Sequence, residues 1–156
     1  MSRNKEAINL SWLVEKWTIW DNSYLKNIWL NLDTLDLVRI NDDINDNDDI
    51  EESYIDIENN MDEFVCMPGK EAVNKKLARE VFMDYLDGQD RDRLFENYNE
   101  YSADEQFLDL IYELGLEYKL QEFREKVAGA ILLNWANEED IKVNKDMEII
   151  NIYGRD

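Results

Sequence analysis

The chain has 156 residues, of which 44% are hydrophobic, and its aromatic residues include five Trp, five Phe and eight Tyr. This composition excludes a disordered chain and predicts a single folded domain over residues 1–156 with a large aromatic core. The 37 acidic residues outnumber the 17 Lys and Arg, so the net charge is −20. Because such a charge repels phosphate groups, we expect no direct binding to nucleic acid or to an anionic membrane.

The secondary structure of the N-terminal third is predicted from the spacing of its aromatic and aliphatic residues. Apolar residues at helical spacing over residues 8–13 indicate one helix. Apolar side chains then recur at positions i, i+3, i+4 and i+7, namely at Leu25, Ile28, Trp29 and Leu32. This pattern favours a second helix, although the alternation over residues 28–32 also fits a strand.

An acidic stretch runs from Ile40 to Glu63 and holds eleven Asp or Glu residues but no Lys or Arg. The apolar and β-branched residues at 34–40 predict a strand that ends where the acidic stretch begins. Residues 53–58 alternate isoleucine with acidic residues, which predicts a second strand. The simplest arrangement is a hairpin with a long acidic connection, and a connection of this length indicates function or mobility.

The C-terminal part is predicted to be helical. Residues 67–70 include the only proline and mark a possible boundary between the aromatic and acidic N-terminal part and this helical part. Gly115 is expected to end one of the helices, and the small residues at 128–130 indicate the close approach of a neighbouring segment. The last predicted strand is at residues 147–153.

The predicted fold class is therefore α+β. It is mostly helical, with a small antiparallel sheet and a helical bundle in the C-terminal half. The predicted strands of that sheet lie near residues 34–40, 53–58 and 147–153.

Several kinds of catalytic site are disfavoured by composition. The chain has no histidine, which removes the commonest general base and metal ligand. Cys66 is the only cysteine, so it has no partner for an intramolecular disulfide. Glycine-rich phosphate-binding motifs are absent, and the S-x-x-K pattern at residues 23–26 lacks its companion motifs. We therefore expect a non-enzymatic protein that requires no cofactor.

The predicted location is the cytoplasm. The first residues lack the uninterrupted apolar core of a signal peptide. No stretch approaches the ~18 consecutive apolar residues that are typical of a membrane-spanning helix. A single cysteine also suits a reducing compartment.

Part of the acidic stretch resembles a calcium-binding EF-hand loop over twelve residues. Its odd positions carry side-chain oxygens, at Asp43, Asn45, Asn47, Asp49 and Glu51. However, Asp48 replaces the glycine of position 6, and Tyr54 replaces the bidentate glutamate of position 12. A weak calcium-binding module is therefore one alternative, and we expect no dedicated metal site.

A second acidic feature is regular. Carboxylates recur every four residues at Glu105, Asp109, Glu113 and Glu117. On a helix this interval places like charges about 6 Å apart along one face. The row is an ordinary solvated face opposite Phe107 and Ile111, but its interval is also close to that of successive phosphates along one nucleic-acid strand.

In size, acidity and lack of catalytic motifs, the chain resembles acidic DNA-mimic inhibitors encoded by phages and plasmids, of the antirestriction and anti-CRISPR types. It also resembles immunity proteins that block nuclease toxins. The resemblance implies that the protein occupies the nucleic-acid-binding site of a basic nucleic-acid-binding protein or nuclease complex. The expected partner-binding residues are Asp42, Asp43, Asp46, Asp48, Asp49, Glu51 and Glu52, with Glu105, Asp109 and Glu113.

The sequence is also consistent with a different class of function. A non-enzymatic adaptor or structural protein would bind through an exposed aromatic face, because such faces mark interaction sites. The tryptophans of the N-terminal third are the candidates for that face: Trp12, Trp17, Trp20 and Trp29.

Overall fold

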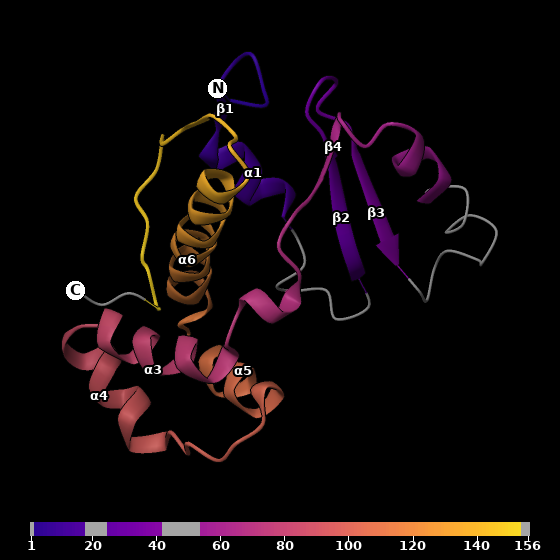
Figure 1. Ribbon diagram of the computed structural model, residues 1–156. Helices are drawn as coiled ribbons and strands as arrows, with labels where there is room; N and C mark the ends of the chain where they lie inside the picture. Colours follow the sequence, from indigo (N-terminus) through magenta and orange to yellow (C-terminus); the bar gives the residue numbers. More distant parts are fainter. Residues whose placement is uncertain (1, 18–24, 42–53, 154–156) are drawn as a thin grey trace.

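The longest helix, α6, lies between the N-terminal helix α1, the C-terminal segment and the smaller helices of the computed structural model (Figure 1). The structure describes residues 2–17, 25–41 and 54–153. Residues 54–59 are helical, and a short 3-10 helix, η1, covers Lys70–Ala72. The other elements are, in chain order, β1 (Ile8–Asn9), α1 (Leu10–Lys16), β2 (Leu25–Asn31), β3 (Leu37–Asn41), β4 (Phe64–Cys66), α3 (Lys75–Tyr85), α4 (Gly88–Asn97), α5 (Asp104–Glu113), α6 (Glu117–Glu138) and β5 (Val143–Asn144).

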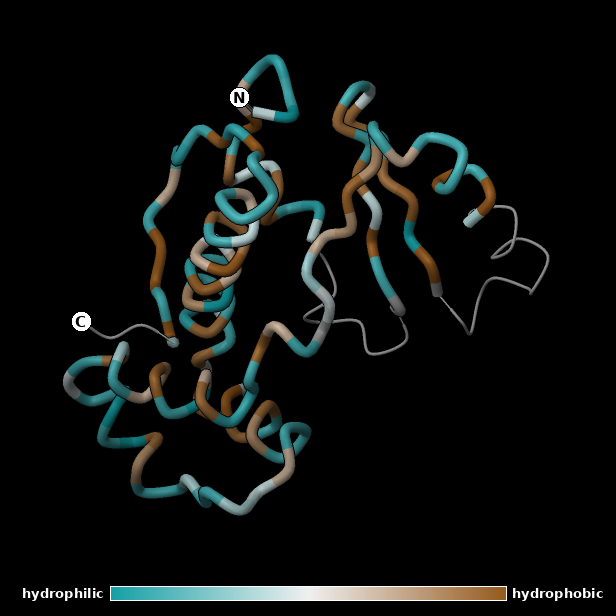
Figure 2. The backbone as a smooth tube through the Cα atoms, viewed as in Figure 1, coloured by the Kyte–Doolittle hydropathy of each residue, from teal (hydrophilic) through white to brown (hydrophobic). Residues whose placement is uncertain are grey.

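Strands β2, β3 and β4 form an antiparallel sheet in the order β3–β2–β4, and helices α3 to α6 make up most of the C-terminal half. The α+β class is therefore confirmed. Strands β1 and β5 form a separate parallel pair, in which Ile8 is opposite Val143. Hydrophobic residues recur along β2, β3 and α6 (Figure 2). Ile28, Leu30 and Val65 of the sheet belong to one core cluster with most of the buried residues of the helices. The buried Ile40, Ile57 and Phe64 are not part of that cluster.

The helix favoured over residues 25–32 is wrong, because β2 occupies Leu25–Asn31. Ile28 and Leu30 are fully buried, as the alternative strand pattern requires, and β2 is the central strand of its sheet. Hydrogen bonding to two neighbouring strands outweighs the helical spacing of the same residues. The strand predicted at 34–40 is confirmed in its second part, as β3.

The strand predicted at 53–58 is wrong, since residues 54–59 are helical. Within this helical segment Ile57 is buried, whereas Ile55 is half exposed. The second neighbour of β2 is instead β4, where Phe64 and Val65 are both buried. The more apolar segment therefore takes the place in the sheet that the alternating segment was expected to fill.

The strand predicted at 147–153 is also wrong. This segment pairs with no strand and runs along α6, where the Ile150 amide donates to the Lys126 carbonyl (3.0 Å). The outer edge of β4 is not open to it. Side chains already bind two of that edge's carbonyls: Arg3 donates to Phe64 (3.2 Å) and Trp135 donates to Cys66 (3.0 Å). A sheet edge satisfied in this way has no place for another strand.

The close approach expected at residues 128–130 is confirmed. Gly129 is buried in the middle of α6, and a Cβ atom there would lie 3.0 Å from Ile149 Cγ2 and from Met147 Cε. The missing side chain lets the C-terminal segment pass directly over the helix. This contact explains why a glycine is found inside a 22-residue helix.

Helices α5 and α6 end in the same way. After α5, the Leu116 amide donates to the Ile111 carbonyl (3.0 Å) and Gly115 has a φ of 70°, as predicted for a glycine that ends a helix. After α6, the Ile141 amide donates to the Ala136 carbonyl (2.8 Å). The residue that takes the left-handed conformation there is Asp140, with a φ of 56°.

Replacing Asp140 with glycine is expected to stabilise the protein by about 1 kcal/mol, because glycine adopts a positive φ without strain. The change also removes a negative charge from the C-terminal end of a helix, where such charges are unfavourable. Urea unfolding followed by circular dichroism would show a higher midpoint. The control is Glu138→Gly, at the last residue of α6, which should lower the midpoint because glycine is a poor helix former. A midpoint for Asp140→Gly at or below that of the wild type would contradict the argument.

No helix within the described part of the chain is long and apolar enough to span a membrane.

Candidate acidic interface

Three of the four carboxylates of the predicted row lie on the solvent side of α5, whereas the fourth, Glu117, begins α6. Glu105, Asp109 and Glu113 are exposed, while Phe107 and Ile111 are buried against the core. The helix begins at Asp104, and its N-cap is Ala103, whose amide donates to the Gln106 side chain (3.0 Å). The exposed row therefore follows from the amphipathic pattern of this helix.

Acidic charge extends beyond α5 to the preceding helix. Eleven acidic residues and two arginines lie between residues 84 and 117, a local charge of −9. Both arginines lie near carboxylates: Arg91 is 3.8 Å from Asp84, and Arg93 is 3.7 Å from Asp90. Neither arginine forms an ion pair with the α5 row among the described residues.

A further acidic pair on α4 was not identified from the sequence. Asp92 and Glu96 are exposed and lie four residues apart, so they share one helical face. Neither has an ion-pair partner among the described residues. The net charge of residues 84–117 is the sequence signal that would have found this pair. A count of charges detects acidic residues even where they do not recur at a regular interval. Arg93, on the same helix, donates to the Leu114 carbonyl just after α5 (3.0 Å), so the two acidic helices are held together.

One acidic residue of α5 has a structural role instead. Asp104 accepts a hydrogen bond from Arg79 (3.2 Å) and lies 3.5 Å from Lys75. The Arg79 guanidinium is buried and lies 5.2 Å from the centre of the Phe107 ring. This pair fixes the start of α5 on α3, so the exposed row is presented by an anchored helix.

Exposed aromatic residues accompany these acids. Tyr112 lies on α5 and is 74% exposed, while Tyr101 is 85% exposed just before this helix. Tyr112 follows Asp109 by three residues, so both lie on the same face of the helix. Tyrosine is enriched in protein–protein interfaces, since it combines a large apolar ring with a hydroxyl group.

The tryptophans do not form the alternative aromatic face as a group. Trp17 is buried and its indole donates to the Pro68 carbonyl (2.9 Å). Trp12 and Trp29 are half-buried, and Trp20 lies outside the described residues. Trp17 and Trp135 thus attach the sheet side of the molecule to the helices by indole hydrogen bonds.

The other predicted partner-binding residues lie outside the part of the chain that the structure describes: Asp42, Asp43, Asp46, Asp48, Asp49, Glu51 and Glu52. The same holds for the calcium-like loop, apart from Tyr54, which begins the helical segment 54–59. Among the described residues, no group of three or more potential ligands is arranged to hold a metal ion. The structure therefore gives no arrangement for the acids at residues 42–52, and their sequence alone indicates their charge.

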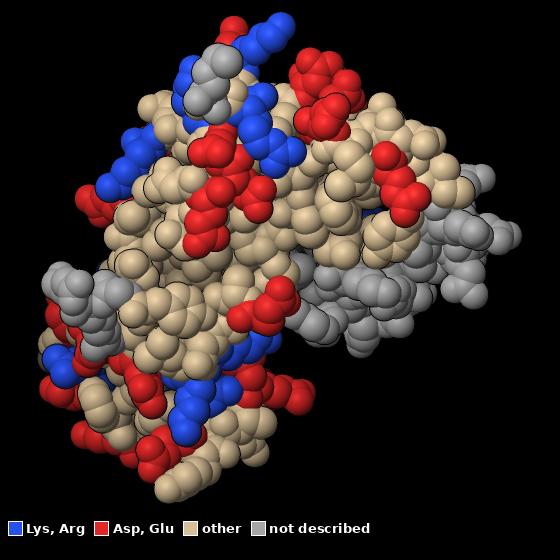
Figure 3. All heavy atoms as spheres, in the orientation of Figure 1, with Lys and Arg blue, Asp and Glu red and all other residues tan. Residues whose placement is uncertain are grey.

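On the face shown in Figure 3, acidic side chains are spread over the helical part and over the upper edge of the molecule. Lysine and arginine side chains lie between several of them, so this face is acidic but not uniformly so. The electrostatic attraction of a basic partner would therefore depend on local rows such as that of α5 as well as on the net charge.

Three polar groups with an altered pKa belong to the framework, namely Tyr85, Glu122 and Cys66. The hydroxyl of Tyr85 donates to Glu122 and accepts from Lys126 (3.4 Å), which links α3 to α6. The Glu122 hydrogen bond raises the pKa of Tyr85 and lowers that of Glu122 itself. Burial raises the pKa of the half-buried Cys66 thiol, which disfavours the reactive thiolate.

No family model, curated protein or solved structure matches the chain.

Proposed function

We propose that this protein is an acidic inhibitor that occupies the nucleic-acid-binding site of a basic partner, such as a nuclease or another nucleic-acid-binding protein. The observation that carries the proposal is the anchored, exposed carboxylate row of α5 within a region of charge −9. The net charge of −20 would attract a basic groove at long range and would repel competing nucleic acid.

The α5 row would act at close range. Glu105, Asp109 and Glu113 would accept hydrogen bonds from lysine or arginine side chains that otherwise contact phosphates. The ring of Tyr112 would add apolar area beside Asp109, because long helical side chains lean towards the N-terminal end of their helix. A guanidinium can stack on such a ring while it binds the neighbouring carboxylate.

The acids at residues 42–52 would add to this attraction. They number seven, with no Lys or Arg among them. Together with the α5 row they make up the proposed contact residues, and they would reinforce binding through their charge. Inhibition would then be competitive, since both ligands need the same basic surface.

Affinity capture tests the proposal. The immobilised protein would be incubated with a nuclease-treated lysate at low salt and then eluted in two parallel arms. One arm receives duplex DNA at constant ionic strength, and the other receives salt alone. The proposal predicts that retained nucleic-acid-binding proteins are released by DNA. Retention that DNA cannot reverse, or no retained nucleic-acid-binding protein at all, would contradict it.

A further inference from the structure

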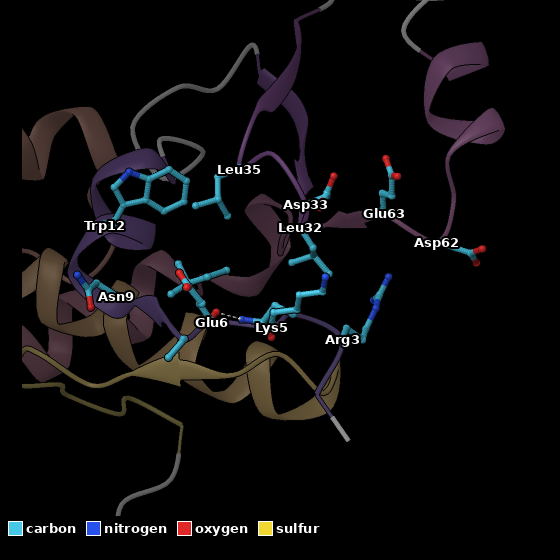
Figure 4. Close-up of a pocket in the computed structure, with 13 residues that line it drawn as sticks. Arg3, Lys5, Glu6, Asn9, Trp12, Leu32, Asp33, Leu35, Asp62 and Glu63 are labelled. Atoms are coloured by element: carbon cyan, nitrogen blue, oxygen red, sulfur yellow. Dashed lines mark hydrogen bonds between the residues drawn. The ribbon is translucent and has the colours of Figure 1, made fainter.

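A groove of about 700 Å³ separates the N-terminal segment from the sheet (Figure 4). One wall consists of residues 3–9 and Trp12, and the other of the β2–β3 turn at residues 32–35 with Asp62 and Glu63. The volume lies within the range of ordinary ligand pockets. The groove involves neither α4 nor α5, so it is distinct from the acidic interface.

The groove has an apolar end and a charged end. Figure 4 shows Trp12 and Leu35 toward one end, near Glu6 and Asn9, and Asp33, Asp62, Glu63 and Arg3 toward the other, with Lys5 between the two groups. Such a division suits a ligand that carries an apolar group beside a charged one.

Leu35 is held in an unusual conformation. Its φ is 63°, in the left-handed region that glycine and asparagine adopt much more readily than leucine. The turn is already specified by Asn31, whose side chain accepts from the amides of Asp33 (2.8 Å) and Thr34 (3.0 Å). The side chain of Leu35 is nevertheless 41% exposed in the groove. An exposed leucine kept at a strained position indicates a role for the side chain itself.

The charges of the groove favour a basic ligand. Four acidic side chains line it against Arg3 and Lys5. Arg3 is already engaged, since it binds Glu139 (3.3 Å) and the Phe64 carbonyl (3.2 Å). The carboxylates of Asp33 and Asp62 have no partner among the described residues, so they are available to a cation.

The backbone of one wall favours a peptide. Ile8 bonds to the segment before β5 through its amide, which donates to the Lys142 carbonyl (3.0 Å). Its neighbour Ala7 lines the groove and is exposed, and its backbone has no hydrogen-bond partner among the described residues. An extended peptide can pair with such an edge through its own main chain.

We infer that this groove binds a short, extended peptide segment of a partner protein, which carries an apolar side chain and, two residues away on the same face, an arginine or lysine. The apolar side chain contacts Trp12 and Leu35, and the basic side chain binds Asp33 and Asp62. This site does not depend on the proposed inhibition, because a peptide could dock here whatever α5 contacts.

Fluorescence anisotropy with three labelled hexapeptides tests the inference on the full chain. Their sequences place leucine and arginine, serine and arginine, or leucine and glutamate two residues apart, with threonine between them. The leucine–arginine peptide is expected to bind about tenfold more tightly than the serine–arginine peptide, since only the former can bury apolar area. It should also bind more tightly than the leucine–glutamate peptide. Equal affinities for the two arginine peptides would overturn the inference, because binding would then depend on charge alone and not on the apolar side chains.

Two variants locate the binding. Leu35→Asn should reduce the affinity for the leucine–arginine peptide at least fivefold while the melting temperature stays the same or rises, because asparagine tolerates a positive φ. Asp62→Asn, at an exposed position, should reduce that affinity about threefold and provides a second test should the first variant fold poorly. Unchanged affinity in the folded variants would overturn the inference. Amide substitutions on α5 should leave the ratio between the two arginine peptides unchanged, which separates this site from the acidic interface.

Discussion

Replacing the α5 carboxylates with amides (Glu105→Gln, Asp109→Asn and Glu113→Gln) is expected to weaken binding to the basic partner about 30-fold at low salt, at about threefold per exposed charge. The loss should shrink as salt rises, because exposed charges are screened. The fold should remain intact, since the three side chains are exposed and like charges four residues apart repel each other. Titration calorimetry at two salt concentrations measures the change.

The matched control removes the same number of charges elsewhere, through Glu80→Gln, Glu125→Gln and Glu138→Gln on α3 and α6. Both triple variants have the same net charge, so a difference between them reports the α5 row specifically. The proposal predicts a much smaller loss for the control. Equal losses would show that net charge alone governs binding.

The second large effect concerns stability. Replacing Trp135 with alanine is expected to lower the free energy of unfolding by about 3–5 kcal/mol, because a buried indole is lost from the core. Trp135→Phe keeps most of the apolar volume but removes the donor to the Cys66 carbonyl, which should cost about 1–3 kcal/mol. For a protein of typical stability, about 5–15 kcal/mol, the alanine variant would be close to unfolding.

Urea denaturation with two probes would check this prediction. The control is Trp12→Phe, because Trp12 is half-buried and its indole has no hydrogen-bond partner among the described residues. Its loss should be smaller than that of Trp135→Phe. If the two phenylalanine variants were equally stable, the indole bond to β4 would not be an important attachment of the sheet.

The helical part was largely predictable because its signals are local. Gly115 ends α5 as expected, since a positive φ favours glycine whatever surrounds it. The buried and exposed faces of α5 likewise follow from the spacing of Phe107 and Ile111.

The sheet was less predictable because its strands compete for partners that are distant in sequence. Residues 25–31 fit both helix and strand, and the choice depends on the presence of β3 and β4 on either side. Residues 53–58 have a good strand pattern but lose their place in the sheet to Phe64–Cys66. Propensity alone cannot rank two candidates for one sheet edge.

The acidic interface and the groove differ in the same way, since the first follows from a local pattern and the second from residues that are distant in sequence. The α5 row is a regular pattern within one helix, and its exposure was predictable. The groove joins residues 3–9, 32–35 and 62–63, which only the fold brings together. Leu35 in particular looks like an ordinary residue of a predicted strand until its backbone conformation is known.

Direct competition for the partner tests the central proposal most closely. A fluorescent duplex would be titrated with the captured partner at several fixed concentrations of this protein, and the apparent Kd for the duplex would be measured by anisotropy. The account predicts that the apparent Kd rises in proportion to the concentration of this protein, with the same bound signal at saturation. It also predicts that the α5 triple variant shifts this dependence to higher concentrations. An apparent Kd that does not change, while this protein remains bound to the partner–DNA complex, would contradict the account.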